Sequence, residues 1–279
     1  SAILLEGPPE PEIINKIFLE EKPTLFFGVP TLFAILLASD NLPTKDEHDV
    51  RLCISAGEPL PSDLLARWQG TFGVDILDGL GTTEMLHIFV SNRPDEITPG
   101  STGRVVPGYQ IRLINDNNEV CAPGEMGVLE VSGPSSALMY WGQRQKTKDT
   151  FKGTWTRTGD NYSISEKGVM TYGGRNDDML KVGGIYVSPF EVEAALIKHE
   201  AVLEAAVVGN NDQDGLVKPK AFIVLNKNFT GSDELASELI NFVKTNLAEY
   251  KYPRWIEFLD ELPKTATGKI QRFKLRTAS

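Results

Sequence analysis

The chain has 279 residues, a formal net charge of −10 and 24% charged residues, an ordinary globular composition with room for one large domain or two smaller ones. The acidic balance argues against a general nucleic-acid-binding role, and no apolar run approaches the roughly 20 residues of a membrane span. The only cysteines are Cys53 and Cys121, so we expect neither a disulfide scaffold nor a zinc site and assign the protein to the reducing cytoplasm.

The first hundred residues alternate between helix and strand patterns. Helical spacing predicts a helix over 10–23, the run "TLFFGVP" predicts a short buried strand, and a helix begins at Pro30. "VRLCISAGEPLP" reads as a strand that runs into a glycine turn, and "VDILDGLGTTE" repeats this pattern. Between them, 62–73 predicts a helix with Ser62 as N-cap and Gly73 as its stop. The alternation predicts an α/β fold with a parallel sheet.

The remaining residues show two further patterns. From about 100 to 175, short alternating strands separated by turns predict a small antiparallel or barrel-like unit. Beyond it, Ser188 followed by Pro189 and Glu191 predicts a capped helix, and later stretches predict three strands and a helix over 232–250. We therefore predict three parts, which are listed here in chain order: 1–100 as part of a large α/β domain, 101–175 as a β-rich subdomain, and 176–279 as a mobile α+β C-terminal cap.

Two glycine-rich turns carry residues that suit nucleotide chemistry. In "ISAGEPLP", Gly57 before Glu58 and Pro59 would let a flat ring approach the backbone, although a plain turn explains it equally well. In "LDGLGTTEM", Thr82 and Thr83 can donate to phosphate oxygens. Glu84 in the same stretch can hold Mg²⁺ between phosphates. Gly79 and Gly81 lack the third glycine of a dinucleotide loop. A capping box that opens a helix at Thr82 is the structural alternative.

Three later stretches add candidate polar groups. "TWTRTGDN" puts Asp160 after a tight Thr-Gly turn, where a carboxylate could accept two ribose hydroxyls or simply belong to a hairpin turn. "GGRNDDMLKVGG" offers Arg175 as a ribose or phosphate donor, or a solvated charged linker. "PKTATGKIQR" is no Walker A loop, because Pro263 stands where its first glycine should be. Taken alone, this stretch predicts a surface turn in which Lys269 is solvated.

The order of these five motifs resembles the adenylate-forming superfamily of acyl-CoA synthetases, luciferases and peptide-synthetase adenylation domains. "FFGVPTLFA", "TTEMLHIFVSN" and "KVGGIYVSPFEVE" are similar to its benzoate-CoA ligase branch, and the resemblance covers essentially the whole chain. The family's phosphate loop does not occur before residue 55. We therefore expect the C-terminal part of such an enzyme, inactive on its own.

The resemblance implies a role for each candidate residue. Lys269 would contact the substrate carboxylate and the α-phosphate, and Glu84 would hold Mg²⁺. The implied ATP- and CoA-binding residues are Gly57, Glu58, Pro59, Asp78, Gly79, Thr82, Thr83, Asp160, Arg175, Lys181, Gly183 and Gly184. Asp177 would be the hinge of the cap. The implied acyl pocket comprises Phe33, Gly81, Leu86, His87 and Ile88, for which core packing is the alternative.

The sequence thus predicts an ATP-dependent aryl-CoA ligase that uses ATP, Mg²⁺ and CoA on a small aromatic acid. Two alternatives stay open: an enzyme that loads a carrier-protein thiol, and a non-catalytic fragment or interaction module. A homodimer is also left open.

Overall fold

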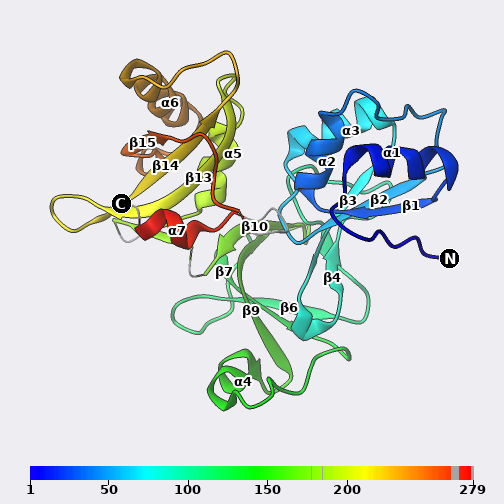
Figure 1. Cartoon of the computed structure of the whole chain (residues 1–279). Helices are drawn as coiled ribbons and strands as arrows, with labels where there is room; N and C mark the ends of the chain where they lie inside the picture. The colour runs from blue at the N-terminus through cyan, green and yellow to red at the C-terminus, as the bar shows by residue number, and fades with distance from the viewer. Residues whose placement is uncertain (177, 184, 265–269, 278–279) are drawn as a thin grey trace. The chain divides into compact units, whose positions relative to one another are not determined.

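The computed structural model describes residues 1–176, 178–183, 185–264 and 270–277 (Figure 1). The chain divides into two compact units. Unit 1 comprises Ser1–Thr158 with Tyr162–Tyr172, and unit 2 comprises Gly159–Asn161 with Gly173–Ser279. The predicted three-part division, with boundaries after residues 100 and 175, stays a prediction.

Unit 1 begins with a five-stranded sheet in the order β1-β2-β3-β4-β5. Its strands are β1 (Leu25–Gly28), β2 (Leu52–Ala56), β3 (Ile76–Gly81), β4 (Ile88–Ser91) and β5 (Arg104–Val105). The first three strands are parallel, because helices connect them, and the last two join antiparallel. The predicted α/β class with a parallel sheet is confirmed.

Three helices cover one face of this sheet (Figure 1): α1 (Pro11–Glu20), α2 (Pro30–Leu37) and α3 (Ser62–Phe72). They bury a shared core in which Phe18, Phe33 and Trp68 pack with edge-on or tilted rings. Two local predictions are wrong. The strand over 24–30 is an exposed edge strand rather than a buried one, since Phe27 is 62% exposed. Ser62 is the first helical residue, and its side chain caps nothing.

The second sheet of the chain has the order β10-β9-β7-β6. Its strands are β6 (Gln110–Ile114), β7 (Met126–Ser132), β9 (Trp155–Ile164) and β10 (Met170–Arg175), with β8 (Phe151–Lys152) paired to β9 and α4 (Arg144–Thr150) leading into β8. The predicted Thr-Gly turn before Asp160 is wrong, because Asp160 lies inside the continuous strand β9. Gly159 has a φ of +78°, and such a glycine lets a strand bend without ending.

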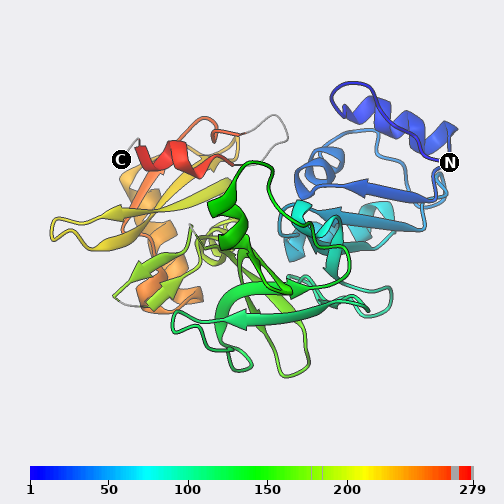
Figure 2. The same cartoon turned by 90° about the horizontal axis from the view of Figure 1, so that it is seen from below.

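Unit 2 is built on a three-stranded sheet in the order β13-β14-β15. The strands are β13 (Val202–Asn211), β14 (Val217–Leu225) and β15 (Trp255–Phe258). Side chains alternate between its faces with a period of two. Ala205 and Val207 point into one core and Ala206 and Val208 into another, so both faces are covered. The β13–β14 hairpin projects from the rest of unit 2 (yellow in Figures 1 and 2).

Helices cover both faces of this sheet. α5 (Pro189–Leu196) and α6 (Asp233–Asn246) contribute to one core, and α7 (Arg272–Thr277) contributes to the other. The predicted cap of α5 is confirmed in part: Ser188 accepts a 3.3 Å hydrogen bond from the Glu191 amide, but the Glu191 carboxylate bonds Lys251 instead of closing the box. A short hairpin of β11 (Leu180–Val182) and β12 (Ile185–Val187) precedes α5.

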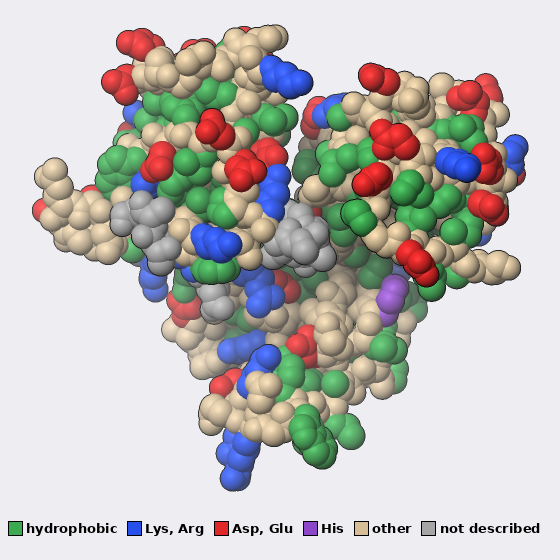
Figure 3. All heavy atoms as spheres, in the orientation of Figure 1, with side chains coloured by type: hydrophobic (Ala, Val, Ile, Leu, Met, Phe, Trp, Pro, Cys, Tyr) green, Lys and Arg blue, Asp and Glu red, His purple; other side chains and the backbone are tan. Residues whose placement is uncertain are grey.

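The surface of the α1–α3 layer that Figure 3 shows carries acidic side chains scattered among hydrophobic ones. Such mixing is usual, because a globular protein has too little polar surface to cover itself. Within the described part of the chain, none of the helices combines the length and the apolar character that crossing a membrane requires.

Candidate functional site

One group of candidate residues lies where β2 and β3 end in unit 1. These neighbouring parallel strands pair Ser55 with Asp78, so their carboxyl ends share one edge of the sheet. That edge is the usual ligand-binding position in an open α/β sheet. Gly57 follows β2 with a φ of +91°, which few residues other than glycine adopt. Glu58 accepts a 3.2 Å hydrogen bond from the hydroxyl of Thr31, which fixes the turn against α2.

Asp78 is a buried carboxyl in β3, with 5% of its surface exposed. Burial raises the pKa of Asp78 to about 7. Hydrogen bonds from the Leu60 and Gly79 amides and the Thr102 hydroxyl offset only part of that rise. Leu60 directly follows the half-buried Pro59, so the bond to Leu60 ties the turn after β2 to β3. The edge of the sheet therefore holds a carboxyl that changes charge near neutral pH.

Close packing requires the glycine at position 81, where the neighbour is backbone, and crowds Gly79, where the neighbour is the end of the flexible Ile88 side chain. A Cβ on Gly79 would lie 2.8 Å from the side chain of Ile88, and one on Gly81 would lie 2.5 Å from the carbonyl oxygen of His87. Both distances are shorter than real Cβ contacts. β4 therefore approaches β3 closely, which explains these glycines without any ligand.

The hydroxyl-carboxylate stretch forms one tight turn of 3-10 helix, Thr83–Met85. The capping-box alternative is wrong here, because Thr82 occupies the N-cap position but its side chain makes no capping hydrogen bond. Thr83 is exposed, and Glu84 is half-buried. Leu86 ends the turn with a φ of +70°, a conformation that is strained for a leucine. Strain of this kind is often found at binding sites.

Glu84 is held by a residue that the sequence reasoning missed. The hydroxyl of Tyr140 donates a hydrogen bond to a carboxylate oxygen of Glu84, and the amide of Ala137 donates to the Glu84 carbonyl at 2.8 Å. Burial alone would raise the pKa of Glu84, but the Tyr140 hydrogen bond and the charge of Lys146 help to lower it below its usual value. Glu84 and Tyr140 are 56 residues apart, and no local pattern links them.

The expected acyl-pocket residues differ widely in exposure. Phe33 is fully buried and packs edge-on against Trp68, with ring centroids 4.8 Å apart. Leu86 is 78% exposed, His87 is exposed and Ile88 is half-buried. Leu86, His87 and Ile88 are consecutive and follow the Glu84 turn directly, whereas Phe33 belongs to the core under the helices.

A second group of candidates lies in unit 2. Arg175 Nη1 is 3.2 Å from Asp160 Oδ1, and the Asp160 side chain is almost fully buried while that of Arg175 is half-exposed. A Cβ on Gly159 would lie 3.2 Å from the Arg175 guanidinium, so the glycine leaves the space that this pair occupies. The Asn176 amide donates to the Gly159 carbonyl at 2.8 Å. Two candidates separated by 15 residues are thus brought together.

The β11–β12 hairpin carries two further candidates. Lys181 pairs in register with Tyr186, and its ammonium lies 5.3 Å from the centre of that ring. Gly183 follows β11 with a φ of +58°, which the tight hairpin requires. Both residues are exposed.

Three predicted residues, Asp177, Gly184 and Lys269, lie outside the described part of the structure. On either side of 265–269, Lys264 and Ile270 form an antiparallel bridge.

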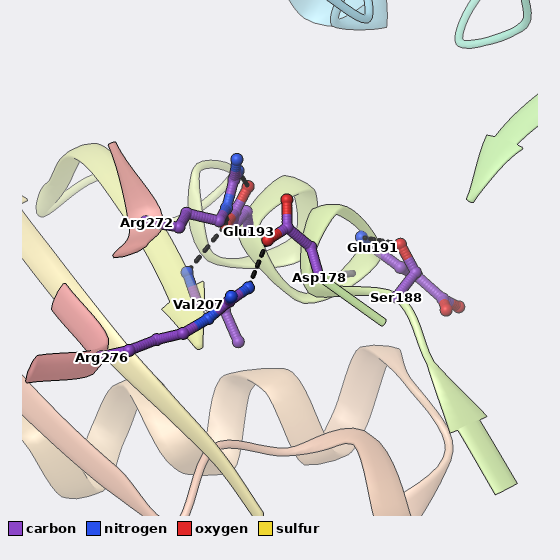
Figure 4. A network of polar contacts seen from close by, with 7 residues as sticks. All are labelled: Asp178, Ser188, Glu191, Glu193, Val207, Arg272 and Arg276. Atoms are coloured by element: carbon purple, nitrogen blue, oxygen red, sulfur yellow. Dashed lines mark hydrogen bonds and ion pairs between the residues drawn. The ribbon is translucent and has the colours of Figure 1, made fainter. Parts of the chain in front are cut away.

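A buried ion pair in unit 2 was not predicted (Figure 4). Arg272 bonds both oxygens of Glu193 at 2.7 and 2.9 Å, and Glu193 also accepts the Val207 amide at 2.7 Å. Nearby, Arg276 on the same helix pairs with Asp178. Because Glu193 interrupts the apolar stripe of α5, its position was a usable signal for a buried, paired carboxylate.

Magnesium can be tested against the residues present. Among the residues described, no three His, Cys, Asp or Glu side chains gather into a metal cluster. Glu84 is a single half-buried carboxylate. Mg²⁺ is commonly held by only one or two carboxylates together with substrate phosphates and water, so Glu84 fits a metal carried in with ATP.

Two family models match the chain. The one described as AMP-binding enzyme matches residues 1–141, and the one described as AMP-binding enzyme C-terminal domain matches residues 191–269.

Similar proteins cover the chain from end to end. It is 56% identical over 279 residues to a benzoate–CoA ligase of Thauera aromatica, which is 100% of this chain and 53% of that protein. It is 49% identical over 278 residues to a 4-hydroxybenzoate–CoA/benzoate–CoA ligase of Rhodopseudomonas palustris, covering 99% of this chain and 51% of that protein. The chain therefore spans about half the length of these curated relatives.

Solved structures show the same relationship. A benzoate CoA ligase from Burkholderia xenovorans LB400 matches with a TM-score of 0.89 and 53% identity, covering 96% of this chain and 54% of that one. An anthranilate CoA ligase, AuaEII, solved in complex with anthranoyl-AMP, matches with a TM-score of 0.91 and 46% identity, covering 100% of this chain and 54% of that one.

Proposed function

Because the chain belongs to the AMP-binding enzyme family, we propose that it is part of an ATP-dependent aryl-CoA ligase that acts on benzoate or a closely related aromatic acid. The observation that carries this proposal is the similarity of every part of the chain to ligases named for benzoate. The chain spans about half of those proteins, so the activity is proposed for the full-length enzyme.

The proposed reaction has two steps that balance. An oxygen of the aromatic carboxylate attacks the α-phosphorus of ATP, the bond to the β-phosphate breaks, and pyrophosphate leaves. The thiolate of CoA then attacks the acyl carbon of the adenylate, and AMP leaves with the carboxylate oxygen that it received. In the first step two anions meet, so the site must supply positive charge and hydrogen-bond donors.

The edge of the sheet in unit 1 would bind the adenine and the phosphates. In this proposal Gly57, Glu58 and Pro59 flank the adenine ring, and Asp78 and Gly79 lie beside it. The proposed phosphate donors are Thr82 and Thr83. Mg²⁺ held by Glu84 would neutralise charge on the phosphates. The shared carboxyl edge of β2 and β3 and the lowered pKa of Glu84 support this assignment.

The pair in unit 2 would hold the ribose. A buried carboxylate can accept both ribose hydroxyls, and the 3.2 Å contact with Arg175 orients Asp160. Lys269 is the proposed cation that stabilises charge at the α-phosphate. The pantetheine of CoA would pass beside the Lys181–Gly184 hairpin. Asp177 would be the hinge at which the cap rotates between the two steps.

For the acyl pocket we propose Gly81, Leu86, His87 and Ile88 as the wall. Support comes from the strained, exposed Leu86, which ends the Glu84 turn and is followed by His87 and Ile88, while Gly81 lies just before that turn. Phe33 would contribute to the acyl pocket only through core packing, because its side chain is fully buried. We also assign the enzyme to the cytosol, since both cysteines are free and Cys53 is buried.

The test is an acid panel with the full-length enzyme. ATP–pyrophosphate exchange is measured with benzoate, hydroxybenzoates, acetate and hexanoate, and CoA is then compared with a phosphopantetheinylated carrier protein as the thiol. We expect exchange to depend on the aromatic acids and CoA to be consumed. Exchange with the aliphatic acids only, or transfer to the carrier protein only, would contradict the proposal.

A further inference from the structure

A loop over residues 135–140 forms hydrogen bonds to the turn that carries Glu84. The amide of Ala137 donates to the Glu84 carbonyl at 2.8 Å, and the hydroxyl of Ser135 donates to the Met85 carbonyl at 2.8 Å. The hydroxyl of Tyr140 donates to the Glu84 carboxylate itself. Two of these bonds hold the backbone of the turn, and only the third touches the functional group.

Tyr140 is itself held on several sides. Its amide donates to the hydroxyl of Thr147 at 3.1 Å, which anchors it to α4. The ammonium of Lys146 lies 4.0 Å from the centre of its ring, and the ring of Phe151 packs against it with centroids 5.6 Å apart. A phenol has one proton to donate, and because the ring is held in place, the Glu84 carboxylate receives that hydrogen bond from a fixed position.

We propose that Tyr140 is a positioning residue that orients the Glu84 carboxylate for Mg²⁺·ATP. The inference rests on the proposed function, because it takes Glu84 as the metal-binding carboxylate. An ionised carboxylate has about four lone-pair sites, so one hydrogen bond from a phenol leaves room for a metal. Partners of this kind orient metal ligands, and their loss typically lowers metal affinity by about 10- to 100-fold.

The chain offers a matched control in Tyr109. Its hydroxyl lies 2.8 Å from the Ser135 hydroxyl. Because Ser135 gives its single proton to Met85, Tyr109 is the donor in that pair. Removing the Tyr109 hydroxyl therefore weakens the same loop without touching the Glu84 carboxylate.

The experiment measures ATP binding to the resting full-length enzyme by equilibrium dialysis, with Mg²⁺ and with EDTA. The Mg²⁺-to-EDTA affinity ratio is taken within each protein, so a loss of folded material cancels. We expect Tyr140→Phe to lower this ratio about tenfold and Tyr109→Phe to leave it unchanged. In Glu84→Gln the ratio should fall to about one, because Mg²⁺ would no longer improve ATP binding. We also expect Glu84→Gln/Tyr140→Phe to be no worse than Glu84→Gln alone, because Tyr140 acts through that carboxylate.

Each contrary result has a distinct meaning. An unchanged ratio in Tyr140→Phe, an equal fall in Tyr109→Phe, or an additional fall in the double variant would overturn the positioning role while leaving the proposed function intact. A normal ratio in Glu84→Gln would overturn the metal role of Glu84, and the positioning role with it. Absence of aromatic-acid-dependent exchange in the wild-type enzyme would instead refute the proposed function.

Discussion

Replacing Arg272 by methionine should strip a buried carboxylate of its partner. The side chains of Arg272 and Glu193 are 11% and 7% exposed, and three hydrogen bonds of 2.7, 2.9 and 3.2 Å join them. Removing one member of such a pair costs about 3–5 kcal/mol, because the other charge stays buried and unpaired. The matched control is Arg276→Met, whose partner Asp178 is more exposed, so its loss should cost under about 1 kcal/mol.

The effect of Arg272→Met should depend on pH. Burial raises the pKa of Glu193 and Arg272 opposes that rise, so the folded-state pKa climbs further in the variant. A carboxyl whose folded-state pKa lies above its unfolded value loses stability as pH rises between the two values. The cost should therefore be larger at pH 8 than at pH 5.5, because a lower pH favours the neutral form of the unpaired carboxyl.

Hydrogen exchange at the Val207 amide measures the loss of local stability in unit 2, because that amide donates to Glu193 at 2.7 Å. At pH 8, a loss of about 3 kcal/mol corresponds to an opening equilibrium about two powers of ten larger. Arg272→Met/Glu193→Gln should recover most of the protection, since glutamine is neutral and can still accept the amide. Acceleration under tenfold at pH 8, or an equal opening equilibrium at both pH values, would show that Arg272 does not stabilise a buried, charged Glu193.

Three further predictions concern the candidate site. The pKa of Asp78 is about 7, above the roughly 3.9 of an unfolded aspartate, so wild-type stability should fall as pH rises from about 4 to 7, by at most about 4 kcal/mol. Asp78→Asn should lose this dependence in urea unfolding at pH 5 and 8, and an unchanged slope would contradict the assignment. Gly81→Ala puts a Cβ 2.5 Å from a carbonyl oxygen and should lower the rate of ATP–pyrophosphate exchange in the full-length enzyme at least about tenfold, whereas Gly70→Ala, with open space around it, should not. Lys269→Ala in the full-length enzyme should slow adenylation roughly 10²- to 10³-fold but spare thioester formation from supplied benzoyl-adenylate; equal losses would remove its proposed role.

Periodicity and turn chemistry predicted most elements of the fold because they act over a few residues. The helix from Pro30, the left-handed stop at Gly73 and the three strands β13, β14 and β15 all appear where expected. The turn predicted before Asp160 is wrong because β9 continues through the positive-φ Gly159 while it lies between β10 and β7 in its sheet. The prediction of a buried strand over 24–30 is wrong because β1 lies at the edge of its sheet, and composition does not encode that position.

The candidate site divides along the same line. Positions after parallel strands made Gly57 and Glu84 candidates from sequence, since the carboxyl ends of such strands share an edge. The partner of Glu84 could not be found that way, because Tyr140 is brought to it by a loop 56 residues later. Glu193 is an intermediate case: its place in the apolar stripe of α5 could have indicated a buried partner, but only the fold identifies Arg272.

The most direct test of the central claim follows the oxygen atoms of the acid. The full-length enzyme is given benzoate labelled with ¹⁸O in both carboxylate positions, together with ATP and CoA, and the products are analysed by mass spectrometry. We expect benzoyl-CoA with one ¹⁸O and AMP with one ¹⁸O, because the carboxylate oxygen stays on the phosphorus that it attacked. Unlabelled AMP, or label in inorganic phosphate released together with ADP, would contradict this expectation.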